Sequence, residues 1–207
     1  MKIAFVLFVF TLLSSSHASV NDFCVADTKA PDTPNGYPCK PVKGLTSDDF
    51  VFHGFVAGNT NKSDPVAVTT AFVADFPALN GLGISAARLD IAEGGTVPMH
   101  THTGATELVI ILEGEINAGF LTPTLAYSKT LKSGDLIVFP QGMLHYLVNS
   151  GKGKASAFLT FSSANPGTKL LDNLLFSNNL PSELVAQTTF LDLAQVKKLK
   201  LRFGGRG

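Results

Sequence analysis

The stretch PMHTHTGATE places His100 and His102 two residues apart and follows them with Glu107. Side chains of a strand alternate between its two faces, so histidines at i and i+2 share a face only in extended backbone. The step from His102 to Glu107 is odd and requires a bend or a change of register, for which Thr103 and Gly104 are suited. The spacing therefore predicts a strand, a glycine bend and a second strand, with two imidazoles and a carboxylate converging.

A third imidazole can join this group from elsewhere in the chain. His145 opens a predicted strand, and antiparallel pairing could bring it across from His100 and His102. We interpret His53 as an ordinary packed or surface residue, because a lone histidine carries no motif. Three imidazoles and one carboxylate suit a divalent transition metal and leave two octahedral positions open, whereas catalytic zinc more often takes three protein ligands.

Short apolar runs predict the elements that must position these donors. Between residues 50 and 163 they cover 66–73, 84–91, 108–112, 116–121, 136–139, 144–148 and 155–161, and many are separated by glycine or proline. Many short strands with such breaks are typical of a β-sandwich or β-barrel. The predicted fold is therefore mainly β and forms one domain.

The periodicity becomes helical in the last part of the chain. Leu170, Leu171, Leu174 and Leu175 form an apolar stripe at helical spacing. A short helix is predicted over 182–187, and Asp192 is expected to cap a third, with Gln195 at the capping-box position and Val196 and Leu199 on its inner face. These C-terminal helices offer more apolar surface than one small barrel needs to cover, so we expect them to pack partly on neighbouring subunits.

Composition limits the possible partners. The 207 residues are 45% hydrophobic and 15% charged, and sixteen Lys and Arg balance sixteen Asp and Glu. Because non-specific nucleic-acid binding rests on neutralising phosphates, this balance gives no reason to expect a nucleic-acid partner. The one basic run lies at the end of the last predicted helix and is interpreted as a solvated face; it comprises Lys197, Lys198, Lys200, Arg202 and Arg206.

The N-terminus has the pattern of a secretory signal peptide. Lys2 precedes an apolar run over residues 3–13, and small residues lead to Ala18. The run is shorter than the roughly 20 apolar residues that cross a bilayer, and no later segment qualifies, so no transmembrane segment is expected. Residues 1–18 are therefore assigned to the signal and the protein to the extracellular space.

Secretion predicts two covalent features. The only two cysteines, Cys24 and Cys39, are expected to form a disulfide in an oxidising compartment, a reading favoured over zinc binding because no histidine or second cysteine pair stands near them. They tie an N-terminal arm over residues 19–49. Asn61 begins the glycosylation sequon Asn-Lys-Ser.

The spacing of the donors resembles two motifs of the cupin family. The first reads Gly94, His100, His102, Glu107 and Gly114, and the second reads Gly134, Pro140, Gly142, His145 and Asn149, each at the family's spacing. The stretches DFCVAD, GYPCK, FPALNGLGISAARLD, VFPQGMLH and TFSSANPG further resemble the germin-like proteins of plants. The resemblance covers essentially the whole chain after the signal peptide.

This resemblance implies an architecture and a metal. The expected fold is a single-domain cupin β-barrel, or jelly roll, over residues 50–163, with a C-terminal helical extension over 164–207. The family's ligands correspond to His100, His102, Glu107 and His145, and the usual ion is Mn(II). The implied assembly is a homo-oligomer, a hexamer built as a trimer of dimers, located in the apoplast or cell wall.

The resemblance also implies candidate functions. We expect superoxide dismutase activity with superoxide as substrate, and we assign Glu107 and His145 as the catalytic residues. The alternative is a non-catalytic apoplastic protein that binds a small carboxylate of the auxin type, or a storage or defence cupin. Oxalate oxidation is disfavoured, because Ala87 and Val97 stand where oxalate-oxidising germins have asparagines, and an apolar pair offers no hydrogen bond to a dianion.

Overall fold

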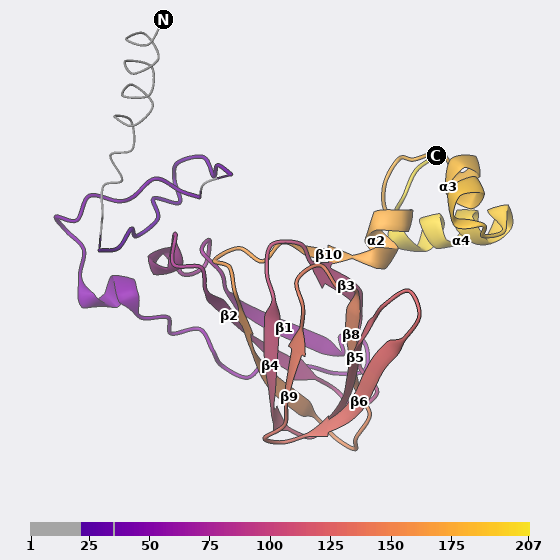
Figure 1. The fold of residues 1–207 in the computed structure, drawn as a ribbon, viewed down its shortest axis with the longest axis horizontal. Coiled ribbons are helices and arrows are strands. Elements are labelled where there is room, and N and C mark those ends of the chain that lie inside the picture. Colours follow the sequence, from indigo (N-terminus) through magenta and orange to yellow (C-terminus); the bar gives the residue numbers. More distant parts are fainter. Residues whose placement is uncertain (1–21, 35) are drawn as a thin grey trace, which may run out of the picture.

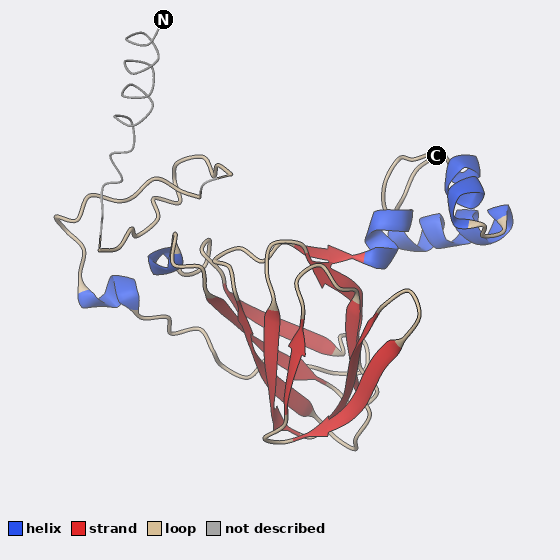
Figure 2. Cartoon of the chain, viewed as in Figure 1, coloured by secondary structure: helices blue, strands red, loops and turns tan. Residues whose placement is uncertain are grey.

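The computed structural model describes residues 22–34 and 36–207, so the predicted signal peptide lies outside the described residues. Two five-stranded antiparallel sheets face each other as a β-barrel, with an arm before them in the chain and a helical lobe after them (Figure 1). Strands dominate and helices gather at the C-terminus (Figure 2), which confirms the mainly β fold class.

The first sheet has the order β1-β2-β9-β4-β7 and the second the order β10-β3-β8-β5-β6. The strands of the first are β1 (Val66–Ala71), β2 (Ser85–Ile91), β9 (Ala155–Phe161), β4 (Glu107–Glu113) and β7 (Leu136–Phe139). Those of the second are β10 (Thr168–Leu170), β3 (Thr96–His102), β8 (His145–Asn149), β5 (Glu115–Leu121) and β6 (Ala126–Lys132). All seven apolar runs of the sequence fall on strands.

The strands bury one face against the opposite sheet. In β4, Val109 and Ile111 are buried, whereas Leu108 and Leu112 on the alternate face are exposed. The inner faces of both sheets form one apolar core, in which Ile116 of β5 and Leu147 of β8 are fully buried. This alternation packs the two sheets against each other, and the packed strands fix the positions of the polar residues at one end of the barrel.

Three strands lie outside the seven apolar runs: β3 was expected from the spacing of its two histidines, whereas β6 and β10 were not predicted. β6 has the sequence AYSKTLK, and Leu131 is its only buried residue. It forms the outer edge of its sheet by pairing with β5, so backbone hydrogen bonds rather than buried side chains hold it in place. β10 is three residues long and pairs with β3 at the opposite edge.

The disulfide between Cys24 and Cys39 is confirmed. The arm that it ties carries the short helix η1 (Ser47–Phe50) and docks beside η2 (Pro77–Leu79). Buried Asn80 joins the two parts, because its Nδ2 donates to the carbonyl of Tyr37 at 2.8 Å and its Oδ1 accepts from the Tyr37 amide at 3.3 Å.

The helical lobe contains α2 (Leu171–Phe176), α3 (Ser182–Thr189) and α4 (Leu193–Phe203). The predicted cap is present, since Oδ1 of Asp192 accepts from the amides of Ala194 and Gln195 at 2.8 and 3.2 Å. Phe176, Val185 and Val196 form a small core of their own. The described helices are all too short or too polar to cross a membrane.

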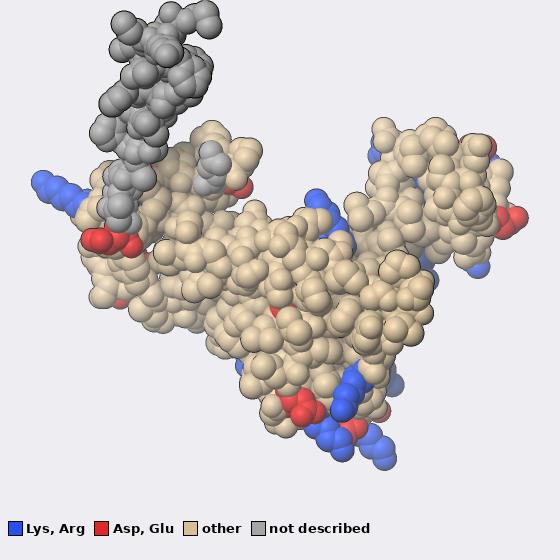
Figure 3. Space-filling view, viewed as in Figure 1, with Lys and Arg blue, Asp and Glu red and all other residues tan. Residues whose placement is uncertain are grey.

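Lys200 corrects the interpretation of the basic run as solvated. Its side chain is buried, and Nζ donates to the backbone carbonyls of Asn178, Leu180 and Arg206. The ammonium group thus links Arg206, after α4, to the loop between α2 and α3. By contrast, Lys197 stays exposed and pairs with Glu183 at 3.3 Å. On the face shown in Figure 3, most of the surface carries neither acidic nor basic side chains, and no broad basic patch is visible.

Candidate metal centre

Four buried donors meet at one end of the barrel. His100 and His102 lie at the C-terminal end of β3, His145 is the first residue of β8, and Glu107 is the first residue of β4 in the opposite sheet. Their ligand atoms all lie within 4.8 Å of one another. The structure therefore brings together the four residues expected from the sequence as metal ligands.

The predicted bend explains how β3 and β4 reach the same point. The chain turns at Thr103 and Gly104 and passes from the second sheet to the first, so the odd step to Glu107 aims its carboxylate back at the two histidines. Gly104 lies close to the backbone of 165–166, where an added Cβ would stand 3.2 Å from the carbonyl oxygen of Asn165. Antiparallel pairing sets His145 directly opposite His100.

The outer ring nitrogens of two histidines are held by backbone carbonyls. Nδ1 of His100 lies 2.8 Å from the oxygen of Pro98, and Nδ1 of His145 lies 2.8 Å from that of Met143. A carbonyl only accepts, so each Nδ1 carries the hydrogen and each Nε2 presents a lone pair to the centre. This tautomer is the one that a metal-binding imidazole requires.

Glu107 provides the negative charge of the centre. Its Oε2 lies 2.9 Å from Nε2 of His145 and 3.2 Å from Nε2 of His102. With Nδ1 of His145 donating to a carbonyl, the close contact sets a nitrogen lone pair against a carboxylate oxygen, which needs a cation or a proton between them. Oε1 is buried and has no hydrogen-bond partner among the described residues. A metal ion would satisfy this carboxylate, so the donor set fits a divalent transition-metal ion.

The surroundings of His100 and Glu107 favour their deprotonated forms. Burial and the neighbouring His145 lower the pKa of His100 to about 4. Burial alone would raise the pKa of Glu107, but the adjacent imidazoles of His102 and His145 outweigh it and lower the pKa to about 2. At neutral pH the chain therefore offers a carboxylate and at least one neutral imidazole without having to lose protons.

Two phenylalanine rings pack against the imidazoles of His145 and His102. The ring of Phe139 stacks on His145 with centroids 4.4 Å apart, and Phe161 contacts the edge of His102 at 4.8 Å. Neither phenylalanine was singled out from the sequence. The available signal in the sequence was that each phenylalanine ends an apolar run; the sheet register then places both beside Glu107.

A small apolar pocket of about 280 Å³ opens beside the donors. His100 and His102 form part of its wall, and Ala87 and Val97 line it as well. Its remaining lining is Val66, Val68, Thr70, Phe72, Leu89, Thr96, Pro98, Leu147, Leu159, Phe161, Thr168 and Leu170. A ligand in this pocket would meet carbon on nearly every side and the metal ligands at one end.

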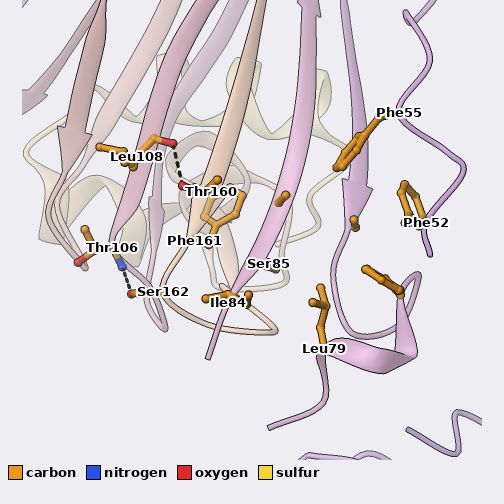
Figure 4. Close-up of a pocket in the computed structure, with 13 residues that line it drawn as sticks. Phe52, Phe55, Leu79, Ile84, Ser85, Thr106, Leu108, Thr160, Phe161 and Ser162 are labelled. Atoms are coloured by element: carbon orange, nitrogen blue, oxygen red, sulfur yellow. Dashed lines mark hydrogen bonds between the residues drawn. The ribbon is translucent and has the colours of Figure 1, made fainter. Parts of the chain in front are cut away.

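A second pocket of about 470 Å³ lies apart from the four donors (Figure 4). Phe52 and Phe55, from the segment before β1, stand over it, with Leu79 and Ile84 at another side. All of its lining side chains are uncharged, and the hydroxyl of Thr160 contacts the carbonyl of Leu108 at 3.5 Å. Because it offers no charged group and no metal ligand, it is not a site for an anion.

The remaining predicted residues lie away from the centre. Asn61 is exposed in the loop before β1, where its Oδ1 accepts from the amides of Ser63 and Asp64 at 2.8 and 2.9 Å. His53 is exposed on the segment between η1 and β1 and is not among the four donors. His17 lies outside the described residues.

Comparison with known proteins agrees with this geometry. Residues 52–197 match the cupin family model. The chain is 58% identical over 198 residues to "Auxin-binding protein ABP19a" of Prunus persica, with 95% of each chain covered. It is 54% identical to "Germin-like protein subfamily 3 member 1" of Arabidopsis thaliana, covering 97% of this chain and 98% of that one. Among solved structures, an oxalate oxidase is similar with a TM-score of 0.83 at 34% identity, covering 89% of this chain and 96% of the other.

Proposed function

This chain belongs to the cupin family as a germin-like protein, and we propose that it is a secreted manganese-binding protein with superoxide dismutase activity. The observation that carries the proposal is the group His100, His102, Glu107 and His145, buried together with a carboxylate oxygen left unpartnered. Four donors of nitrogen and oxygen leave two positions of an octahedron for a small substrate.

The proposed reaction converts two superoxide ions and two protons into one O₂ and one H₂O₂. A manganese ion held by His100, His102, Glu107 and His145 would supply the one-electron redox couple that this reaction needs. Glu107 contributes negative charge, which favours the more oxidised ion. Nδ1 of His145 donates to the carbonyl of Met143, and this hydrogen bond holds Nε2 of the same ring toward Glu107 and the centre of the four donors.

Metal analysis combined with a superoxide assay tests this proposal. The native protein is expected to contain about one manganese ion per chain and to show turnover per bound ion above that of free Mn(II), with unbound metal removed first. A fully manganese-loaded protein with no turnover above free Mn(II) would show that the dismutase proposal is wrong.

Three substitutions assign roles within the centre. His102→Ala and His145→Ala each remove one ligand and should lower manganese occupancy and turnover together. Glu107→Gln keeps the shape but removes the charge, so turnover should fall by more than the loss of metal explains. His53→Ala is the matched control, because it removes an exposed histidine outside the centre and should change neither quantity.

The apolar pocket favours a second candidate function, the binding of a small aromatic carboxylate. Relatives 58% and 56% identical to this chain are named auxin-binding proteins. A pocket of about 280 Å³ is at the small end of ligand sites, which span roughly 300–1,000 Å³. Calorimetry with indole acetic acid should show binding that is lost in His145→Ala if the carboxylate rests on the metal. Equal binding by both proteins would place the ligand elsewhere.

Oxalate oxidation is not proposed, despite the structural similarity to an oxalate oxidase. Ala87 and Val97 both line the pocket beside the metal ligands and give a substrate dianion no hydrogen bond. The native protein should therefore produce no peroxide from oxalate above background. The double substitution Ala87→Asn and Val97→Asn tests whether these two positions are the reason.

A further inference from the structure

The three imidazoles of the metal centre are not held alike. His100 and His145 use carbonyls two residues earlier in their own strands. Nδ1 of His102 instead lies 3.2 Å from the hydroxyl oxygen of Thr168, which is 66 residues further along the chain. The orientation of His102 therefore depends on a tertiary contact, whereas the other two rings are fixed locally.

Several backbone contacts place Thr168 against this ring. β10 pairs with β3 so that Thr168 stands opposite His102 and Leu170 opposite His100. Just before β10, the carbonyls of Pro166 and Gly167 accept from the amides of Gly104 and Thr103 at 3.0 and 3.2 Å. The segment is thus bonded to the bend that carries the chain from His102 to Glu107.

We propose that Thr168 is a positioning residue of the metal centre, whose hydroxyl accepts the Nδ1 hydrogen of His102 and thereby turns Nε2 toward Glu107. The proposal rests on the proposed metal binding and concerns how one ligand is held. Partners of this kind fix the tautomer and rotation of a metal-binding imidazole, and their loss weakens metal binding about 10- to 100-fold.

The same contact links the centre to the helical lobe. β10 ends at Leu170, and α2 begins at the next residue, so the strand that supplies the hydroxyl is continuous with the lobe. α2 also contacts β3 directly. The lobe is therefore joined through β10 to the side chain that contacts His102, whereas His100 and His145 have partners within their own strands.

The chain offers a matched control for the hydroxyl. Thr101 lies between the two histidines on β3, and its Oγ1 is buried without a hydrogen-bond partner among the described residues. Thr101→Val and Thr168→Val remove the same oxygen from neighbouring strands. Only the second removes a contact with a ligand ring, so a general effect of the substitution on the barrel would appear in both.

The experiment measures the Mn(II) affinity of the purified protein by competition with a chelator. Thr168→Val is expected to bind Mn(II) about 10- to 100-fold more weakly, and Thr168→Ser, which restores the hydroxyl, should stay within about threefold of the unaltered protein. Thr101→Val should stay within about twofold. Unchanged affinity in Thr168→Val, or a Thr168→Ser variant as weak as Thr168→Val, would overturn the proposal.

A spectroscopic readout separates positioning from loss of folding. Nitrogen-15 NMR of the Zn(II)-loaded protein, with zinc as a diamagnetic probe, should show a slowly exchanging Nδ1 hydrogen on His102. That signal should persist in Thr168→Ser and disappear in Thr168→Val, while the signals of His100 and His145 remain in both. A persisting His102 signal in Thr168→Val would refute the assigned contact. If the unaltered protein binds no Mn(II), the manganese proposal fails, and the Zn(II) spectra still decide the role of Thr168.

Discussion

Folding disfavours the charged form of His100. It is buried, and His145 lies with its ring centroid 4.1 Å away. Both features favour the neutral ring, which is the form that binds a metal. The arrangement that prepares the ligand therefore makes the metal-free protein sensitive to acid.

The sign of this sensitivity follows from the pKa of His100, which folding lowers from 6.5 to about 4. Between these values the unfolded chain binds a proton that the folded chain does not. The contribution of His100 to stability is therefore complete above pH 6.5 and is lost as the pH falls toward 4, at up to about 1.4 kcal/mol per pH unit. Urea unfolding of the metal-free protein between pH 7 and 4 measures this loss.

The control for this prediction is His100→Gln, which keeps a polar side chain but does not titrate. Its free energy of unfolding should fall less steeply over the same pH range, because the variant takes up about one proton fewer on unfolding. Glu107 acts in a lower range, since its lowered pKa stabilises the fold above pH 4.5 and the effect is lost toward pH 2. Identical slopes in the two proteins between pH 6.5 and 4 would contradict the assignment to His100.

At the scale of elements, the N-terminal arm depends on cross-links more than on a core. Among the described residues before η1, Val25 and Ala26 are the fully buried apolar ones, and most of the others are exposed or half-buried. The arm is held by the disulfide, by Asn80 and by a backbone hydrogen bond of 2.9 Å from Ala26 to Pro77.

Removing the disulfide should therefore release the arm. Cys24 and Cys39 are 15 residues apart, and a cross-link closing such a loop stabilises by about 3 kcal/mol. The double variant Cys24→Ser and Cys39→Ser is expected to be cut by protease within residues 24–39 while the β-barrel stays intact. An arm that resists protease as well as the unaltered protein would show that Asn80 and the backbone contacts suffice.

At the scale of the whole molecule, the helical lobe leaves large apolar side chains uncovered. Phe190 is 94% exposed and Leu201 is 83% exposed, although Val196 and Phe176 are buried in the lobe's own core. Of the predicted apolar stripe, Leu175 packs against this core, whereas Leu174 is exposed. Leu136 and Val138 of β7 are also exposed on the outer face of their sheet.

Assembly should cover these side chains, and we predict a stable homo-oligomer, with a hexamer as the expected size. Leu201→Glu places a charge on the exposed lobe and should shift the protein toward smaller species in light scattering at micromolar concentration. Leu82→Glu is the control, because it changes an equally apolar, exposed residue in the loop after η2. A stable monomer of the unaltered protein would contradict this prediction.

Secretion and processing are predictions for the whole chain as well. Cleavage after Ala18 should leave Ser19 as the first residue, and the exposed Asn61 should carry a glycan in protein made by plant cells. Intact-mass analysis before and after glycosidase treatment measures both. A mass that glycosidase leaves unchanged would show that the sequon is unused, and a mass that includes residues 1–18 would show that the signal is not removed.

The sequence by itself determined the elements whose signals are local. Apolar runs placed seven strands, since a buried strand must alternate or concentrate apolar residues, and Asp192 marked a helix start by its own side chain. The spacing of His100 and His102 fixed their common face, and the two cysteines had only each other as partners. Such features depend on residues that are near one another in the chain or unique in it.

Only the tertiary structure decided the features that depend on distant partners. β6 and β10 are strands because an edge of a sheet accepts their backbones, and their side chains carry no pattern of burial. Lys200 is buried because two carbonyls of the loop between α2 and α3 and the carbonyl of Arg206 converge on it, although its basic neighbours in sequence suggested solvent. Thr168 reaches His102 across 66 residues, and no local spacing encodes that contact. Pairing at a sheet edge and convergence of loops are properties of the folded chain, so the sequence pattern could not show them.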